Sequence, residues 1–231
     1  MPKEYIYRNN KQLFEDGSLN RICIYCGRKG GTCEHVPPRS FYRGTRSSDD
    51  NTVNACFDCN NKFSKDEDYV SHGIIWMVSK IMGLPLSRKT QRFIKLHGVS
   101  IFANLPTCTS DIKFLNNNKR FARIFTKIAK GHLYHERQIL MIGQDALVEF
   151  DVATDNWDKF SKPLVSHDIN LQDNLIVALT DETGENYIVP VRKETFEIKG
   201  AYIFKIVETS NEIVVEIMLH NFVLVSITFS S

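Results

Sequence analysis

Two Cys-x-x-Cys pairs, Cys23/Cys26 and Cys56/Cys59, place four thiols within one short part of this chain. Thiolates three residues apart on a tight turn can both face one ion, and a second pair completes a tetrahedral set of ligands. This spacing favours a zinc site over four unrelated cysteines. Four thiolates leave no open coordination position, so we expect the Zn²⁺ to hold the segment together and to take no part in catalysis.

Composition narrows the class of protein. The chain has 231 residues, of which 42% are hydrophobic, which is enough for one sizeable core or two small ones. Six cysteines, with Cys33 and Cys108 outside the paired spacing, and no charged-then-apolar leader predict a reducing, cytoplasmic location. The longest apolar runs fall short of the roughly 20 residues that cross a bilayer, so we expect no membrane partner.

Charge is distributed unevenly along the chain. Residues 80–137 hold 12 Lys and Arg against 2 Asp and Glu, whereas residues 138–231 hold 6 against 15. A basic segment beside a metal site suits nucleic acid, because each neutralised phosphate releases counterions. The alternative is a solvated helical face that pairs with the acidic segment. The candidates for phosphate contacts in this segment are Arg88, Lys89, Arg92, Lys95, Lys119, Arg120, Arg123 and Lys127.

Hydrophobic periodicity predicts an α+β protein. Apolar residues recur at helical spacing over 60–82, 87–96 and a third stretch that begins at 109 or 111 and ends at 135. After residue 137 the period changes to two, which indicates an antiparallel β-sheet. The expected units are 1–82 with the metal, a basic helical segment 83–137 and an acidic β-rich domain 138–231. The expected strands are 146–152, 174–179, 187–191, 196–207 and 212–219.

The role of the C-terminal sheet is left open by the sequence. Its acidic surface would repel a DNA backbone, so it is expected to dock onto the basic helices, to self-associate or to bind a protein partner. The apolar segment 222–229 either seals the core or pairs with another subunit. His132 and His135 with Glu136 share a helix end, where packing against the sheet is favoured over a second metal site because no third ligand can be named.

An acid and a histidine lie between the two cysteine pairs. A carboxylate beside an imidazole at the end of a short strand can divide two tasks: Glu34 can bind a hard divalent cation, while His35 stays available as a general base. Asn51 precedes the second cysteine pair, and Asn60 follows it directly. Because the metal fixes the start of the helix, we expect Asn60 on the side of the loop from which Glu34 and His35 emerge.

Residues 20–70 resemble the HNH nuclease family, whose ββα-metal fold surrounds one catalytic ion with two strands and a helix. The resemblance implies that His35 is the general base, that Glu34 and Asn60 hold Mg²⁺ or Mn²⁺, and that Asn51 fixes the loop and orients His35. Many members have histidine where this chain has Asn60, and the asparagine suits an oxygen-preferring ion. The matching text is Cys23-x-x-Cys26, Glu34-His35-Val36-Pro37-Pro38, Asn51-Thr52-Val53-Asn54-Ala55-Cys56-x-x-Cys59-Asn60 and Ser64-Lys65-Asp66-Glu67.

By this resemblance the expected activity is phosphodiester hydrolysis that leaves 5′-phosphate ends. DNA is the expected substrate, and bacterial defence or a mobile element is the expected setting. The alternative is an inactive zinc-ribbon module that binds nucleic acid or protein and needs only the cysteines. Two or three of five nearby basic residues are expected to contact phosphates. These five are Arg39, Arg43, Arg46, Lys62 and Lys65.

Overall fold

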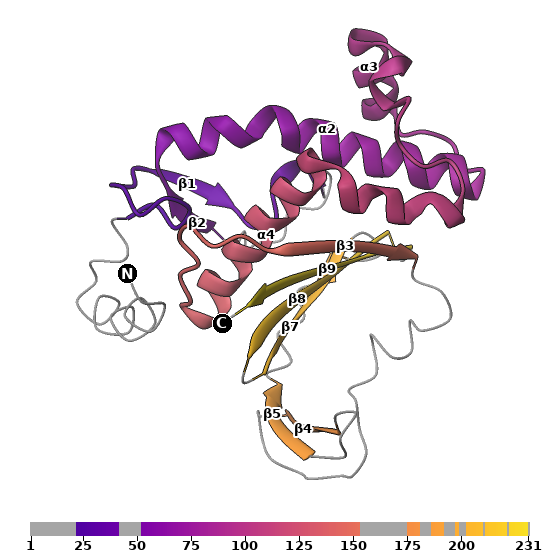
Figure 1. The fold of residues 1–231 in the computed structure, drawn as a ribbon. Coiled ribbons are helices and arrows are strands. Elements are labelled where there is room, and N and C mark those ends of the chain that lie inside the picture. The colour runs from indigo at the N-terminus through magenta and orange to yellow at the C-terminus, as the bar shows by residue number, and fades with distance from the viewer. Residues whose placement is uncertain are drawn as a thin grey trace.

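A computed structural model describes residues 22–41, 52–152, 175–180, 186–191, 197–198, 202–209, 211–220 and 222–230. A small hairpin and long helices form one layer, and an antiparallel sheet lies beneath that layer (Figure 1). The α+β class, with helices before a C-terminal antiparallel sheet, is therefore confirmed. None of the helices in the described ranges combines the length and apolar composition that crossing a bilayer requires.

The hairpin consists of β1 (Thr32–His35) and β2 (Thr52–Ala55). The strands run antiparallel, with Thr32 opposite Ala55 at one end and His35 opposite Thr52 at the other. Side chains in a strand alternate between its two faces, so Thr32 shares a face with Glu34 while His35 points to the opposite face. The hairpin is followed directly by the longest helix of the described chain.

Two helices begin and end close to where the sequence predicts. Helix α2 (Phe57–Met82) starts at the N-cap Cys56 and ends at Gly83, whose φ of 67° provides the left-handed cap that glycine adopts without strain. Helix α3 (Arg88–His97) starts at Ser87, whose side chain accepts a hydrogen bond from the backbone N–H of Thr90. A short 3₁₀ helix, η2 (Arg39–Phe41), precedes β2, and another, η3 (Val99–Phe102), follows α3.

The prediction of one helix from residue 109 or 111 to 135 is wrong. The structure has a 3₁₀ helix η4 (Thr109–Asn117) and then a separate helix α4 (Lys119–Arg137). Asn118 lies between them in an extended conformation, and its Oδ1 accepts hydrogen bonds from the backbone N–H groups of Arg120 and Phe121. An asparagine that caps a new helix competes with continuation of the old one.

The C-terminal sheet has five antiparallel strands in the order β3-β9-β8-β7-β6. The expected strand 196–207 is two strands in the structure, β6 and β7. The last strand, β9, lies between β3 and β8, so the question left open for segment 222–229 is answered within this chain: it completes the sheet. The bounds are β3 (Leu147–Val152), β6 (Glu197–Ile198), β7 (Tyr202–Glu208), β8 (Glu212–Leu219) and β9 (Val223–Ser230). A separate pair is formed by β4 (Leu175–Thr180) and β5 (Asn186–Val191).

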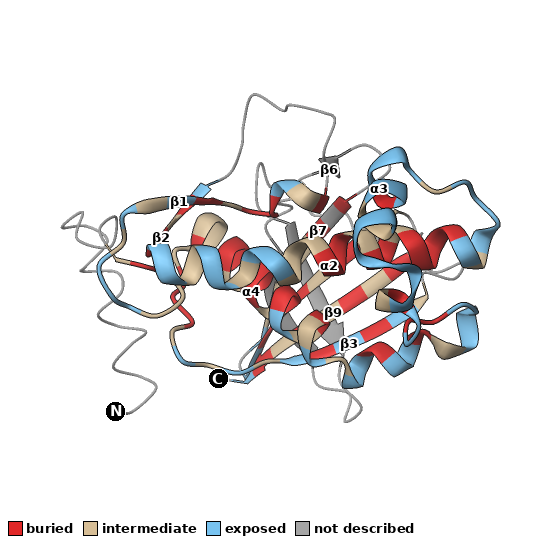
Figure 2. Cartoon of the chain, turned by 90° about the horizontal axis from the view of Figure 1, so that it is seen from above, coloured by how far each residue is buried: buried red, intermediate tan, exposed pale blue. Residues whose placement is uncertain are grey.

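Helix α4 is buried on two sides. Ile124, Phe125 and Ile128 belong to a large cluster that also contains residues of α2, η4 and the sheet. Figure 2 shows α4 lying over β9 and β3, with buried residues along α4 and in the second half of α2. This shared core crosses both expected boundaries, at residues 82 and 137. The division into 1–82, 83–137 and 138–231 stays a prediction about folding units.

Candidate metal centre and nuclease site

The four predicted zinc ligands lie together in the structure. Their sulfur atoms all lie within 4.8 Å of one another, and Sγ of Cys26 is 3.7 Å from Sγ of Cys56. Zinc–sulfur bonds of about 2.3 Å in a tetrahedron require sulfurs about 3.8 Å apart, so the thiols fit the geometry of such an ion. The cluster could hold a metal such as zinc, with Cys23 fully buried and Cys26 partly exposed.

Local backbone geometry positions both pairs. The first pair lies on a turn in which the N–H of Gly27, at φ 74°, donates to the carbonyl of Cys23 at 2.8 Å. The second pair lies at the start of α2, where Cys59 N–H donates to Sγ of the N-cap Cys56 at 3.4 Å. Burial disfavours the Cys26 thiolate, but hydrogen bonds from Arg28 and nearby thiols outweigh burial and lower the pKa of Cys26 to about 6.

Glu34 is buried against α4. Its side chain is 7% exposed, and its Oε1 lies 3.1 Å from Nζ of Lys127, which also forms an ion pair with Glu67 of α2. The pKa of Glu34 is raised because burial disfavours the carboxylate, and Glu67 adds to this effect while Lys127 opposes it. Its second oxygen, Oε2, is buried without a hydrogen bond from any described residue. Glu34, which is predicted to hold the catalytic metal ion, is thus already paired with the ammonium of Lys127.

His35 lies at the end of β1 and is partly exposed, in contrast to Glu34. Its strand partner is Thr52, the first described residue after Asn51. Asn51 itself, predicted to orient His35, is outside the described residues. The residue after His35 is Val36, which is buried against α4 at Gly131.

Asn60 lies on the first turn of α2 and contacts the opposite end of β1. Its Nδ2 donates to Oγ1 of Thr32 at 3.1 Å, and that hydroxyl donates to the carbonyl of Ala55 at 2.9 Å. Thr32 shares a strand face with Glu34, about 7 Å along the strand. The structure therefore brings Asn60 to the face of β1 that carries Glu34, whereas strand alternation directs His35 to the other face.

The hairpin, the first part of α2 and the cysteine cluster lie in a part of the chain that matches a known family. Residues 23–66 match the HNH endonuclease family model. The match confirms, for these residues, the resemblance seen in the sequence. No curated protein and no solved structure matches the chain. Below, residues 23–66 are called the HNH module.

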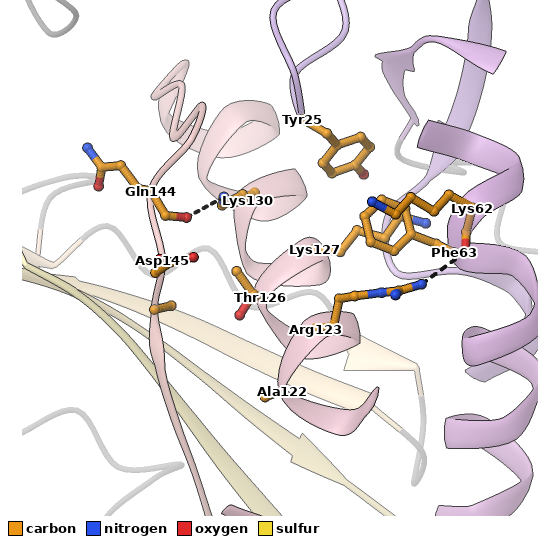
Figure 3. A pocket seen from close by; sticks show the side chains of 11 residues that line it. Tyr25, Lys62, Phe63, Ala122, Arg123, Thr126, Lys127, Lys130, Gln144 and Asp145 are labelled. Atoms are coloured by element: carbon orange, nitrogen blue, oxygen red, sulfur yellow. Dashed lines mark hydrogen bonds between the residues drawn. The ribbon is translucent and has the colours of Figure 1, made fainter. Parts of the chain in front are cut away.

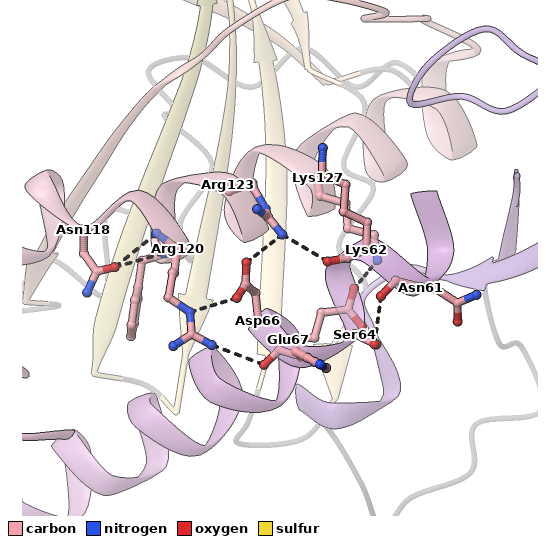
Figure 4. Close-up of polar contacts among 11 residues, drawn as sticks. Asn61, Lys62, Ser64, Asp66, Glu67, Asn118, Arg120, Arg123 and Lys127 are labelled. Carbon is pink, nitrogen blue, oxygen red and sulfur yellow. Dashed lines mark hydrogen bonds and ion pairs between the residues drawn. The ribbon is translucent and has the colours of Figure 1, made fainter. Parts of the chain in front are cut away.

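Helix α4 contacts the HNH module through three cations that sequence reasoning assigned to phosphate contacts. Arg120 and Arg123 form ion pairs of 2.8 and 2.7 Å with Asp66, and Lys127 follows one turn later (Figure 4). These positions, i, i+3 and i+7, form one stripe on a helix. The alternative of internal pairing is thus observed for these three, although their partners lie on α2 and β1 and not in the acidic C-terminal segment. The adjacent acids Asp66 and Glu67 are the feature of the sequence that could have indicated this internal pairing.

A cavity of about 450 Å³ lies between α2, α4 and the segment that follows α4 (Figure 3). Tyr25 and Phe63 line one side, and Nζ of Lys127 lies 5.1 Å from the centre of the Phe63 ring. The pKa of Tyr25 is raised well above its usual value by burial and by the nearby Glu34. Lys130, on the other side, donates to the carbonyl of Gln144, and burial lowers its pKa. Three of the cations that line the cavity, Arg123, Lys127 and Lys130, thus have internal partners.

The histidine pair near the end of α4 is divided between two environments. His132 is fully buried, stacks on Phe204 at 3.6 Å between ring centroids, and places Nε2 2.7 Å from the hydroxyl of Tyr202. His135 is partly exposed and contacts Glu136. Packing of this helix end against the sheet, the favoured alternative, is confirmed for His132.

Proposed function

We propose that this protein is a metal-dependent HNH endonuclease that hydrolyses phosphodiester bonds in DNA. The observation that carries the proposal is that the family match falls on a hairpin, a helix and a four-thiol cluster, with His35 partly exposed at a strand end. Of the described parts of the chain, this module alone combines a partly exposed histidine with a cluster of four thiols. A cytoplasmic role in bacterial defence or in a mobile element is the proposed setting.

In the proposed mechanism His35 acts as the general base. Its imidazole takes a proton from a water molecule, and the resulting hydroxide attacks phosphorus in line with the departing 3′ oxygen. Glu34 and Asn60, on one face of the hairpin, would hold the divalent cation. His35, which strand alternation directs to the other face, would have to turn toward that cation, with Asn51 orienting it. A bound Mg²⁺ or Mn²⁺ supplies charge neutralisation at the phosphate oxygens. The products would carry 5′-phosphate ends.

Lys127 adds a condition to this mechanism. A divalent cation at Glu34 would lie close to the ammonium of Lys127, whose Nζ is 3.1 Å from Oε1 of Glu34, and the two positive charges would repel each other. Cation binding would therefore require Lys127 to turn toward Glu67, its other partner, which lies on α2. Activity should then depend on a higher ion concentration than in a variant whose residue 127 is neutral, provided that the variant stays folded.

The test is incubation of purified protein with supercoiled plasmid and Mg²⁺ or Mn²⁺. We expect nicking or linearisation by the wild type and its loss in His35→Ala, with metal content and DNA affinity nearly unchanged, because a general base acts mainly in the transition state. Replacement of an exposed histidine on α3, His97→Ala, is the matched control and should leave cleavage intact. Equal cleavage by the wild type and His35→Ala would remove His35 from this role.

The second candidate is a module that binds nucleic acid or protein without cleaving it. The pairing of Glu34 with Lys127 favours it, because the predicted cation ligand is neutralised internally. This candidate predicts DNA or protein binding that is independent of Mg²⁺ and Mn²⁺, and no cleavage with either ion. Under the first candidate Asn60→Ala raises the ion concentration needed for half-maximal cleavage, whereas under the second it changes nothing.

A further inference from the structure

One face of helix α3 is fixed to the rest of the protein. Thr90 is fully buried, and its Oγ1 lies 3.1 Å from Nδ1 of His72 on α2. The ring of Phe93 stacks on His72 at 4.5 Å and on Phe102 at 5.8 Å between centroids. These contacts leave α3 standing off the helical layer with its other face toward solvent (Figure 1).

The solvent face of α3 is strongly basic. Its cations are Arg88, Lys89, Arg92 and Lys95, all exposed, and the helix contains no acidic residue. Positions 88, 92 and 95 follow the i, i+4, i+7 pattern of a single helical stripe. None of the four forms an ion pair with another residue in the part of the chain that the structure describes. The charge is therefore available to a partner.

Helix α4 provides the contrast. Its stripe of Arg120, Arg123 and Lys127 is neutralised by acids of α2 and β1. These ion pairs join α4 to its neighbours and leave little charge for an external partner. The same excess of basic residues in the sequence thus divides into an internal set on α4 and an external set on α3. An external stripe with no internal partner has its charge complement outside the described chain.

The length of α2 sets the distance between the basic stripe on α3 and the start of α2 in the HNH module. The module includes the start of α2, and α3 follows the other end of that helix (Figure 1). A helix of 26 residues is about 39 Å long at 1.5 Å per residue. At about 3.4 Å per base pair this length corresponds to roughly 11 base pairs, close to one turn of B-DNA.

We propose that the stripe Arg88, Lys89, Arg92 and Lys95 binds the phosphate backbone of duplex nucleic acid about one helical turn from the start of α2, where the HNH module has its second cysteine pair. The polyanion is identified by the proposed function, on which this inference rests. An acidic protein surface would satisfy the same charges, but the spacing along α2 and the nuclease module at its other end favour nucleic acid. The contact would fix the orientation of the duplex without reading its sequence.

The test measures DNA affinity against salt in a His35→Ala background, so that cleavage does not interfere. Arg92→Gln/Lys95→Gln should reduce the log–log salt slope by about two units, one for each lost phosphate contact. The matched control is Lys113→Gln, which removes one charge from an exposed position on η4 and is compared with the single variant Arg92→Gln, expected to lower the slope by about one unit. The control should leave the slope within about half a unit of the parent. Thermal unfolding should be nearly unchanged in all of these variants, because Thr90 and Phe93 are intact in the α3 variants and the Lys113–Asp151 ion pair lost in the control is exposed.

Duplex length provides a second readout. The parent should bind a 30-base-pair duplex more tightly than an 8-base-pair duplex by a larger factor than the α3 variant does, because the short duplex cannot reach both sites. An unchanged slope in the α3 variant, or equal slopes in variant and control, would overturn the inference. So would tight binding to an acidic protein with no salt-dependent binding to DNA. If α3 controls DNA binding while the wild type cleaves nothing, the inference stands and the proposed function fails.

Discussion

The ammonium of Lys127 lies 3.1 Å from Oε1 of Glu34 and also forms an ion pair with Glu67, so one buried cation joins α4 to both β1 and α2. The side chain of Lys127 is 2% exposed, which means that solvent does not screen these contacts. The residue that holds the predicted cation ligand therefore lies outside the HNH match, on a helix that sequence reasoning assigned to DNA.

Replacement of Lys127 by a neutral residue should strongly destabilise the folded protein. Lys127→Met leaves the buried Glu34 and the largely buried Glu67 without this counter-charge, and breaking a buried pair from one side typically costs about 3–5 kcal/mol. Urea denaturation should show this loss in the free energy of unfolding, with Lys119→Met, an exposed change on the same helix, within about 0.5 kcal/mol of the wild type. The double variant Lys127→Met/Glu67→Gln should recover part of the loss. A change below about 1 kcal/mol for Lys127→Met would show that the ion pairs contribute little.

The approach of α4 to the hairpin depends on Gly131. A Cβ at this position would lie 2.6 Å from Cγ2 of Val36, closer than real atoms approach. Gly131→Ala should therefore destabilise the protein by about 1–3 kcal/mol through overpacking, although alanine favours helix over glycine. Thermal denaturation of Gly131→Ala, Val36→Ala and the double variant forms a cycle, and the double should be more stable than the two losses predict. Simple additivity would argue against the contact.

Metal content should be close to one zinc per chain, because the four thiols fit a tetrahedral ion. Cys23→Ser or Cys59→Ser should lose the metal and expose the HNH module to limited proteolysis, since this segment has few apolar contacts of its own. Cys33→Ser and Cys108→Ser, at exposed thiols, are the matched controls and should keep the metal. Freshly purified, folded protein that contains no zinc by elemental analysis would contradict this prediction.

Acid should destabilise the contact between α4 and the sheet. Burial lowers the pKa of His132 to about 3, whereas an unfolded histidine has a pKa near 6.5. The unfolded state therefore binds the extra proton first, and the free energy of unfolding falls by about 1.4 kcal/mol for each pH unit below about 6.5 until the folded pKa is reached. The difference between the wild type and His132→Phe, measured by urea denaturation from pH 7 to pH 5, should show this slope. His97→Phe, at an exposed histidine, should keep the wild-type slope.

Sequence patterns predict the local elements well because local chemistry fixes them. Gly83 and Ser87 mark the end of α2 and the start of α3, and the paired cysteines indicate their own cluster. The break at Asn118 could have been predicted from its capping chemistry, but the apolar spacing on either side continues through it. Periodicity reports which face is buried, and it does not report that one helix has ended and another begun.

The site is less predictable because it depends on contacts between distant segments. The sequence places Glu34 beside His35, but the pairing of Glu34 with Lys127 arises only when α4 packs on the hairpin. In the same way, counting charge identifies the basic segment without separating cations such as Arg123, which is paired, from cations such as Arg92, which has no ion pair with a described residue. Which charges are free is a property of the packed structure.

Two consecutive residues of α4 contact two different parts of the molecule: Gly131 contacts Val36, next to the proposed base, and His132 contacts Tyr202 in β7. A displacement of β7 would therefore reach the end of β1 through a single turn of helix. A random mutagenesis screen for loss of nuclease activity should return substitutions around Tyr202 and Phe204 in variants whose HNH module is unaltered and still binds metal. The acidic sheet would then support the position of His35 and would not be an independent domain. Truncation of the chain after α4 would remove this support.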